Sequence, residues 1–91
     1  MACIVCVPAP LRPYTGGVDR IELGGASLRD VLTELREAHK PLYARICEPG
    51  GEVRGHVNVY LNEVDIRRLG GLNAPVRDGD EILLVPAIAG G

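Results

Sequence analysis

One stretch of the chain has helical periodicity, and segments with strand periodicity lie on both sides of it. The helical stripe after Ser27 consists of Leu28, Val31, Leu32, Leu35 and Ala38. Spacings of three and four residues are typical of one face of an amphipathic helix. Ser27 and Asp30 fit an N-terminal capping box, and Pro41 is expected to stop the helix after Lys40. A chain with one such helix favours an α+β fold in which the helix covers one face of a sheet.

Alternation of apolar and polar residues predicts strands before and after this helix. The expected strands are residues 2–8, 18–23, 56–61, 64–66 and 81–85. A loop with one proline and two glycines at residues 11–17 joins the first two strands as a hairpin with a long turn. Residues 41–55 are expected to be irregular, with one short helical turn. The order of two strands, one helix and three strands contains no repeat, so residues 1–85 are expected to form a single domain.

The composition is that of an ordinary globular domain, since 46% of the residues are hydrophobic and 24% are charged. No apolar run approaches the roughly 20 residues that cross a bilayer, and the apolar start of the chain lacks the leading Lys or Arg of a signal peptide. The ten Lys and Arg residues are dispersed, the formal net charge is -2, and there is no Phe or Trp for base stacking. These features predict a cytoplasmic protein that binds neither membranes nor nucleic acids.

The three cysteines predict neither a disulfide framework nor a metal centre. Cys3, Cys6 and Cys47 are odd in number and irregular in spacing, which argues against a secreted disulfide scaffold. Cys3 and Cys6 have the CxxC spacing of half a zinc site or a redox pair, but residues three apart in a strand point to opposite faces. We therefore interpret all three as small apolar residues of the core or surface.

The remaining polar candidates also have plain structural interpretations. His39 and His56 have no Ser or Cys nearby in the sequence that would suggest a catalytic triad, so a helix end and a strand start are expected for them. Asp78 and Asp80 flank a glycine and are expected to form a turn before the last strand rather than to hold a metal. The sequence therefore predicts no bound cofactor and no metal.

The chain ends in Gly90 and Gly91, just after the last expected strand. Glycine has no Cβ, so this dipeptide fits a narrow channel in which another protein's chemistry acts on the terminal carboxylate. Residues 86–91 are expected to be a flexible tail that spans roughly 20 Å when extended at about 3.3 Å per residue. The terminal carboxylate is the predicted functional group, and the alternative is a chain end without a role.

Four passages together resemble the MoaD/ThiS family of ubiquitin-like sulfur carrier proteins. They are LRPYTGG at 11–17, SLRDVLTEL at 27–35, HVNVYLNEVDI at 56–66 and DGDEILLVPAIAGG at 78–91. The last passage is the most specific, because it combines a turn, an apolar strand, a proline and a terminal GlyGly. The resemblance covers nearly the whole chain and implies the β-grasp fold, a mixed sheet with one main helix on one face. LRPYTGG and HVNVYLN look most like the carriers that feed cysteine biosynthesis.

The resemblance implies a protein cosubstrate rather than an enzyme. An E1-like adenylyltransferase and sulfurtransferase would use ATP to adenylate Gly91, with Gly90 beside it, and sulfur would then convert the terminus to a thiocarboxylate. The chain has no GxxxxGK[ST] motif of its own for ATP. The sulfur would pass to an acceptor enzyme, either a cysteine synthase-like protein or the large subunit of molybdopterin synthase.

Alternation in the last strands predicts a docking surface for these partners. Tyr60, Leu83 and Val85 are expected to point outward on neighbouring strands, next to Pro86 and Ile88 of the tail. An exposed apolar cluster of this kind typically binds a partner. The alternative is that the chain's own loops cover Leu83 and Val85.

Two other functions use the same terminus. A ubiquitin-like modifier would join Gly91 to lysines of other proteins through isopeptide bonds. The small subunit of molybdopterin synthase would form a lasting complex with its large subunit. A gain of mass at the terminus indicates a carrier, whereas conjugates of high mass indicate a modifier.

Overall fold

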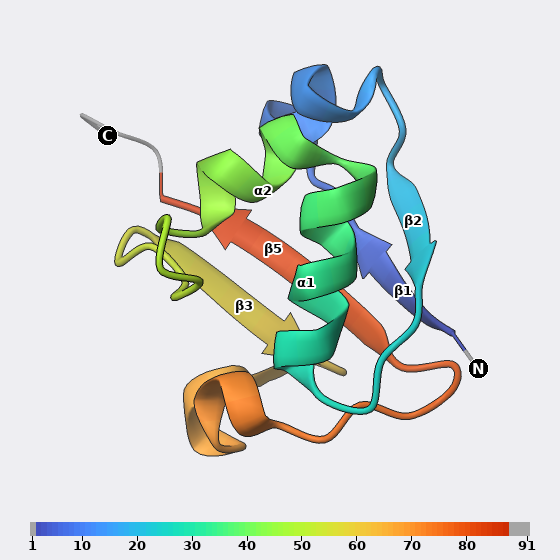
Figure 1. The fold of residues 1–91 in the computed structure, drawn as a ribbon, viewed down its shortest axis with the longest axis vertical. Helices are drawn as coiled ribbons and strands as arrows, with labels where there is room; N and C mark the ends of the chain where they lie inside the picture. Colours follow the sequence, from blue (N-terminus) through green and yellow to red (C-terminus); the bar gives the residue numbers. More distant parts are fainter. Residues whose placement is uncertain (1, 88–91) are drawn as a thin grey trace.

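The computed structural model describes residues 2–87, which fold into a five-stranded sheet with its helices packed on one face (Figure 1). The elements in chain order are β1 (Cys3–Cys6), η1 (Ala9–Thr15), β2 (Arg20–Leu23), α1 (Leu28–Ala38), α2 (Lys40–Ile46), β3 (Val57–Leu61), β4 (Val64–Asp65), η2 (Ile66–Arg68), η3 (Gly71–Asn73) and β5 (Glu81–Pro86). The η elements are short 3-10 helices. None of the helices in the described part is long and apolar enough to span a membrane.

The sheet has the strand order β2-β1-β5-β3-β4. The hairpin partner β2 runs antiparallel to β1, β1 runs parallel to β5, and β3 runs antiparallel to both β5 and β4. The sheet is therefore mixed, as predicted, with the first and last strands side by side at its centre. This arrangement brings the C-terminal end of β5 to an edge of the sheet next to the start of β3.

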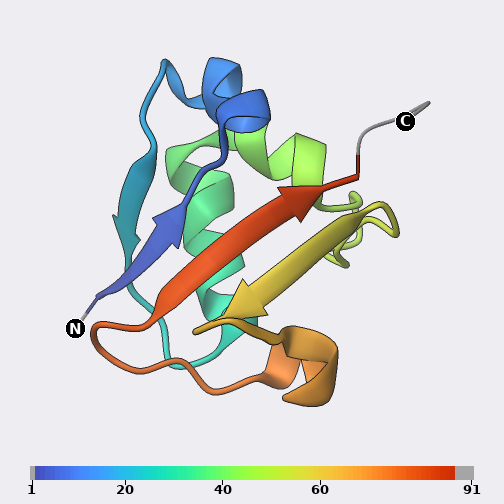
Figure 2. The same cartoon turned by 180° about the vertical axis from the view of Figure 1, so that it is seen from behind.

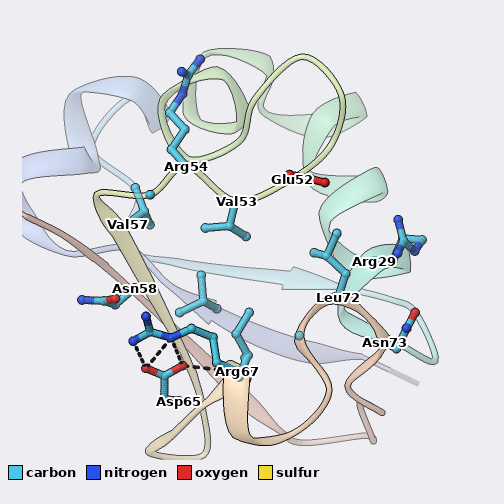
Figure 3. Close-up of a pocket in the computed structure, with 14 residues that line it drawn as sticks. Arg29, Glu52, Val53, Arg54, Val57, Asn58, Asp65, Arg67, Leu72 and Asn73 are labelled. Atoms are coloured by element: carbon cyan, nitrogen blue, oxygen red, sulfur yellow. Dashed lines mark hydrogen bonds and ion pairs between the residues drawn. The ribbon is translucent and has the colours of Figure 1, made fainter.

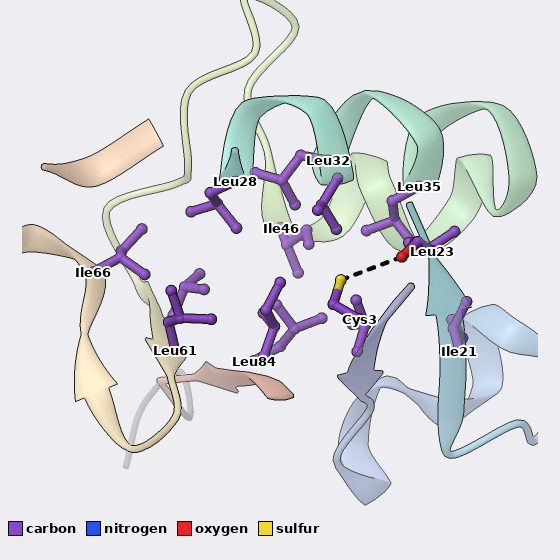
Figure 4. Close-up of a cluster of buried hydrophobic side chains, with 14 of the residues drawn as sticks. Cys3, Ile21, Leu23, Leu28, Leu32, Leu35, Ile46, Leu61, Ile66 and Leu84 are labelled. Carbon is purple, nitrogen blue, oxygen red and sulfur yellow. Dashed lines mark hydrogen bonds between the residues drawn. The ribbon is translucent and has the colours of Figure 1, made fainter. Parts of the chain in front are cut away.

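The core lies between the sheet and the two helices (Figure 4). The alternating residues of the strands that face α1 are fully buried, as are the stripe residues Leu28, Val31, Leu32 and Leu35. The predicted cap is present, since the Ser27 hydroxyl accepts a hydrogen bond from the Asp30 N–H at 3.3 Å. The Asp30 carboxylate in turn accepts from the Ala26 N–H at 3.4 Å, one residue earlier than in a capping box.

Replacing Ser27 by Ala should lower the free energy of unfolding by about 1 kcal/mol, because an N-terminal helix N–H then loses its acceptor. Urea unfolding followed by circular dichroism measures the change. Thr33→Ala is the matched control, since it also removes a hydroxyl from α1, one that donates to the Arg29 carbonyl, and alanine favours a helix. Equal losses in the two variants would contradict a role for the cap.

The helical region differs from the sequence prediction at its C-terminal end. The helix α1 ends at Ala38, which is exposed, and Pro41 lies in the first turn of α2 instead of stopping α1. Proline is tolerated there because the first-turn N–H groups have no partner within the helix. The break occurs at His39, which has an extended φ of -141° and donates its N–H to the Leu35 carbonyl at 2.7 Å.

The region before β2 also differs from the prediction. Most of the loop predicted at 11–17 belongs to η1, and its Thr15 is buried, with the hydroxyl oxygen 2.7 Å from the Val18 carbonyl and 3.0 Å from that of Arg12. Prolines and a left-handed glycine, Gly16 at φ 68°, delimit this compact turn rather than an open loop. Val18 was expected in the second strand, but β2 begins at Arg20 and Val18 is exposed.

The AspGlyAsp turn fixes the start of β5, as the sequence predicted. Asp80 accepts hydrogen bonds from the Arg77 N–H at 2.8 Å and from the Asn62 side-chain amide at 3.0 Å. The Asn62 side chain also accepts from the Glu81 N–H at 3.0 Å, and Asp78 accepts from the Ala2 N–H at 2.8 Å. These carboxylates build a turn, and no group of metal-ligating side chains occurs among residues 2–87.

The stability of the fold should depend on pH through Asp80. Hydrogen bonds from Asn62 and from the Arg77 N–H hold the pKa of this carboxyl below its usual value. A depressed pKa in the folded state contributes stability above the unfolded value of about 3.9, and that stability is lost as the pH falls through the folded pKa. Thermal unfolding from neutral pH down to about pH 2 should show the wild type converging on Asp80→Asn below about pH 4. A constant difference between the two at every pH would contradict this role.

Candidate functional site

The last strand, β5, ends beside the start of β3. Pro86 lies opposite Val57 in the register of β5 and β3, and the Ala87 N–H donates to the His56 carbonyl at 2.7 Å. Because the Ala87 N–H faces β3, the Pro86 nitrogen faces the other side, where pairing with β1 has already ended. The missing N–H of Pro86 therefore removes no bond from the sheet.

The predicted tail residues Ile88, Gly90 and Gly91 lie outside the described residues. Pro86 belongs to β5, and the last hydrogen bond of the strand is made by Ala87. The chain beyond that bond is residues 88–91, which span about 13 Å when extended at about 3.3 Å per residue. This length is shorter than the roughly 20 Å expected for a tail that starts at residue 86.

The face of the sheet away from the helices, which is turned toward the viewer in Figure 2, carries exposed apolar side chains. Leu83 is 42% exposed and Val85 is 36% exposed, whereas their neighbours Ile82 and Leu84 are fully buried. Tyr60 is half-buried and lies directly opposite Leu83 in the register of β3 and β5. The predicted alternation is therefore present, and we call Tyr60, Leu83 and Val85 the outer-face cluster.

Cys6 extends the outer-face cluster across the sheet. It is half-buried and lies beside Leu83 in the parallel register of β1 and β5. Together with Tyr60 and Leu83 it lines a shallow hollow whose polar border includes Asn62 and Glu81. The surface therefore has an apolar centre and a polar border, as protein interfaces do.

The other two thiols lie in the core. Cys3 and Cys47 are buried, and Cys3 lies 3.4 Å from the Leu23 carbonyl, on the face of the sheet opposite to Cys6. Burial raises the pKa of Cys3, and it raises the pKa of Cys47 to about 11. Neither thiol is activated as a nucleophile, because the reactive form is the thiolate.

A groove that was not predicted from the sequence lies beside β3 (Figure 3). Its volume is about 420 Å³, and apolar side chains from Val53, Val57, Ile66 and Leu72 line it. Val57 is the first residue of β3, whereas the others come from the irregular segment before β3 and from the two short helices after β4, where no periodic pattern indicates a wall. No sequence pattern predicts this groove, because its walls come from separate segments of the chain.

Two arginines at the border of the groove are held by carboxylates. Arg67 pairs with Asp65 at 2.6 Å and donates from its backbone N–H as well. These hydrogen bonds lower the pKa of Asp65 to about 2. Arg54 pairs with Glu48, and Figure 3 shows its side chain pointing away from the groove. These two arginines at the border of the groove therefore already have carboxylate partners.

Comparison with known proteins supports the family resemblance. Residues 5–91 match the ThiS family. A protein of Mycobacterium tuberculosis named sulfur carrier protein CysO is 36% identical over 93 residues, with both chains covered completely. Small archaeal modifier protein 3 of Haloferax volcanii is 38% identical over 66 residues, which cover 72% of this chain and 71% of that protein.

A solved structure gives the same result. One chain of the crystal structure of the Amycolatopsis orientalis BexX/CysO complex aligns with a TM-score of 0.89 and 37% identity, covering 99% of this chain and 100% of that chain. The predicted β-grasp fold is confirmed by this similarity.

Proposed function

Because the chain belongs to the ThiS family, we propose that it is a sulfur carrier whose C-terminal Gly91 is adenylated by an E1-like enzyme and converted to a thiocarboxylate. The observation that carries this proposal is the place of β5, which is the central strand of the sheet and is followed in the sequence by the GlyGly terminus. The full-length similarity to proteins named sulfur carrier protein CysO supports the assignment of the cargo. The family resemblance supports a cysteine synthase-like enzyme as the acceptor.

The chemistry requires a partner, because a carboxylate is a poor electrophile. Attack of the Gly91 carboxylate oxygen on ATP gives an acyl-adenylate and releases pyrophosphate. Attack of a sulfide equivalent on the acyl carbon then breaks the bond to AMP and leaves a thiocarboxylate. The chain itself lacks the phosphate-binding loop for ATP, so the proposal makes it a cosubstrate rather than an enzyme.

The outer-face cluster is the surface on which we place the activating enzyme. It lies on β5, the strand that precedes the terminus, and on its neighbour β3, and it has the exposed apolar centre that anchors a partner. A protein docked there would receive residues 88–91 at a fixed position relative to its own active site. Restricting the reactants in this way makes the reaction effectively intramolecular.

A second function, protein modification, is favoured by the relative named small archaeal modifier protein 3. A modifier would use the same acyl-adenylate, but lysine amines of other proteins would replace sulfide as the nucleophile. The two functions therefore share the activation step and differ in the product.

Incubation of the purified chain with an E1-like enzyme, ATP and sulfide tests the proposal and separates the two functions. Intact-mass spectrometry should show a gain equal to the exchange of one oxygen for sulfur, and the gain should require ATP. Isopeptide-linked conjugates in place of that gain would favour the modifier. An unchanged mass with every E1-like enzyme of the host would contradict both.

Replacing Cys3, Cys6 and Cys47 together by Ala should leave sulfur loading intact per folded molecule, because the proposed sulfur atom is bonded to the Gly91 carbonyl carbon. The two buried positions should each lose about 1 kcal/mol of stability from small cavities, so loading is measured below the unfolding temperature of the variant. Cys6→Ala alone is the milder control, since Cys6 is only half-buried. A triple variant that folds and is adenylated but takes up no sulfur would show that a cysteine relays the sulfur.

A further inference from the structure

One arginine links the end of α2 to the start of β3. The Arg54 Nε donates to the Ala44 carbonyl at 3.1 Å, and its guanidinium pairs with Glu48 just after α2. Its backbone N–H donates to the Ile46 carbonyl at 2.9 Å, and its carbonyl accepts from the Val57 N–H at 3.0 Å. Both the side chain and the backbone of Arg54 thus tie residues 54–57 to α2.

The segment held in this way also receives the last hydrogen bond of β5. The acceptor of the Ala87 N–H is the carbonyl of His56, two residues after Arg54. The Arg54 side chain is partly buried, so water screens its charged contacts less than it screens those of a fully exposed pair. No other described residue donates its side chain to α2 from this segment.

We propose that Arg54 is a positioning residue for the activation of Gly91. It holds residues 54–57 against α2 and so keeps the hydrogen bond between Ala87 and His56 formed, which fixes the point at which the chain leaves the sheet. This inference rests on the proposed function. A terminus that leaves from a fixed point reaches the adenylating site in a narrower range of positions, and such restriction lowers the barrier to reaction.

The chemistry of this contact requires arginine. The guanidinium donates in two directions from one rigid plane, to the Ala44 carbonyl and to the Glu48 carboxylate. A lysine ammonium is a compact point charge on a flexible stem, so it satisfies one of these acceptors more readily than both. Arg54→Lys is therefore expected to weaken the hydrogen bond between Ala87 and His56 less than Arg54→Ala does.

Two measurements on the full-length chain test the proposal. In Arg54→Ala, hydrogen exchange of the Ala87 amide should accelerate about three- to tenfold, the factor expected for losing one supporting hydrogen bond. With an E1-like enzyme, kcat for adenylation should fall by a similar factor while KM is unchanged, because the outer-face cluster is intact. Arg67→Ala is the matched control, since it breaks another arginine–carboxylate pair, the one with Asp65 at the border of the groove, and it should alter neither quantity. Exchange of the Ile82 amide in the middle of β5 reports global unfolding.

A double-variant cycle shows whether Arg54 acts through Ala87. Ala87→Pro removes the donor of the last hydrogen bond directly, so adding Arg54→Ala to it should cause no further loss of kcat. Additive losses, an unchanged Ala87 exchange rate in both Arg54 variants, or a loss confined to KM would each overturn the proposal. If the wild-type chain is not adenylated at all, the proposed function fails, and the exchange rates, which need no partner, still decide whether Arg54 holds the exit.

Discussion

Removal of Gly90 and Gly91 should abolish adenylation and sulfur loading while the unfolding midpoint stays unchanged. The reacting carboxylate would then belong to Ala89, two residues nearer to the sheet, and would miss an active site that receives a chain of fixed length. The buried core lies between Cys3 and Leu84, so the deletion removes no core side chain. Pyrophosphate release with an E1-like enzyme and thermal unfolding of the free chain are the two measurements.

A single substitution provides the control for this deletion. Gly50→Ala changes a glycine in the loop after α2, at a position where an added Cβ meets open space, and it should be loaded like the wild type. A truncated chain that still accepts sulfur would contradict the assignment of Gly91. A truncated chain that unfolds would show that the terminus belongs to the folded domain.

Replacing Val85 by Asp should weaken binding to the activating enzyme with little effect on stability. Val85 is exposed and lies on the strand that leads to the terminus. Burying an uncompensated charge, or losing an apolar anchor, at the centre of an interface costs about 1 to 4 kcal/mol, which corresponds to about 5-fold to 1,000-fold in affinity. Titration calorimetry with the activating enzyme measures the change, and Tyr60→Asp should have an effect in the same range.

The chain offers a matched control for the docking variant. Val18 is another exposed valine, at 43%, but it precedes β2 and lies outside the outer-face cluster. Val18→Asp should therefore leave the affinity unchanged. Equal losses of affinity for Val18→Asp and Val85→Asp would argue that the net charge of the protein, and not the outer-face cluster, governs binding. Unfolding of the Val85 variant alone would show that this side chain supports the fold.

The alternation of β3 and β5 could be read from the sequence because each strand has one buried and one open face. Period-two patterns fix which side chains point outward, so Leu83 and Val85 were correctly placed outside the core, and their neighbours Ile82 and Leu84 are buried. The helix α1 was predictable for the same reason, since four of its apolar residues face the sheet.

The observed helices and strands differ from the predicted ones where proline and glycine are expected to end an element. Pro41 lies in the first turn of a new helix, and Pro13 belongs to a compact 3-10 turn. Proline restricts its own φ and removes one donor, and both effects are compatible with a helix start. A rule based on proline alone therefore does not distinguish the end of one helix from the start of the next.

The contacts of Arg54 were not predictable, because they carry no periodic signal. Its side chain bonds to a backbone carbonyl ten residues earlier, and the bond from Ala87 to His56 joins residues that are far apart in the chain. Such contacts depend on how the irregular segment between α2 and β3 folds back on α2. The sequence predicts that the C-terminus is the reactive group, whereas the hydrogen bonds that hold the end of β5 required the structure.

The most direct test of the sulfur-carrier account is the position of the sulfur in the chain isolated from its own cells. Tandem mass spectrometry of the C-terminal peptide should place sulfur in the carboxyl group of Gly91, with Cys3, Cys6 and Cys47 unmodified. Sulfur found instead as a persulfide on Cys6, with an ordinary carboxylate at Gly91, would contradict the account.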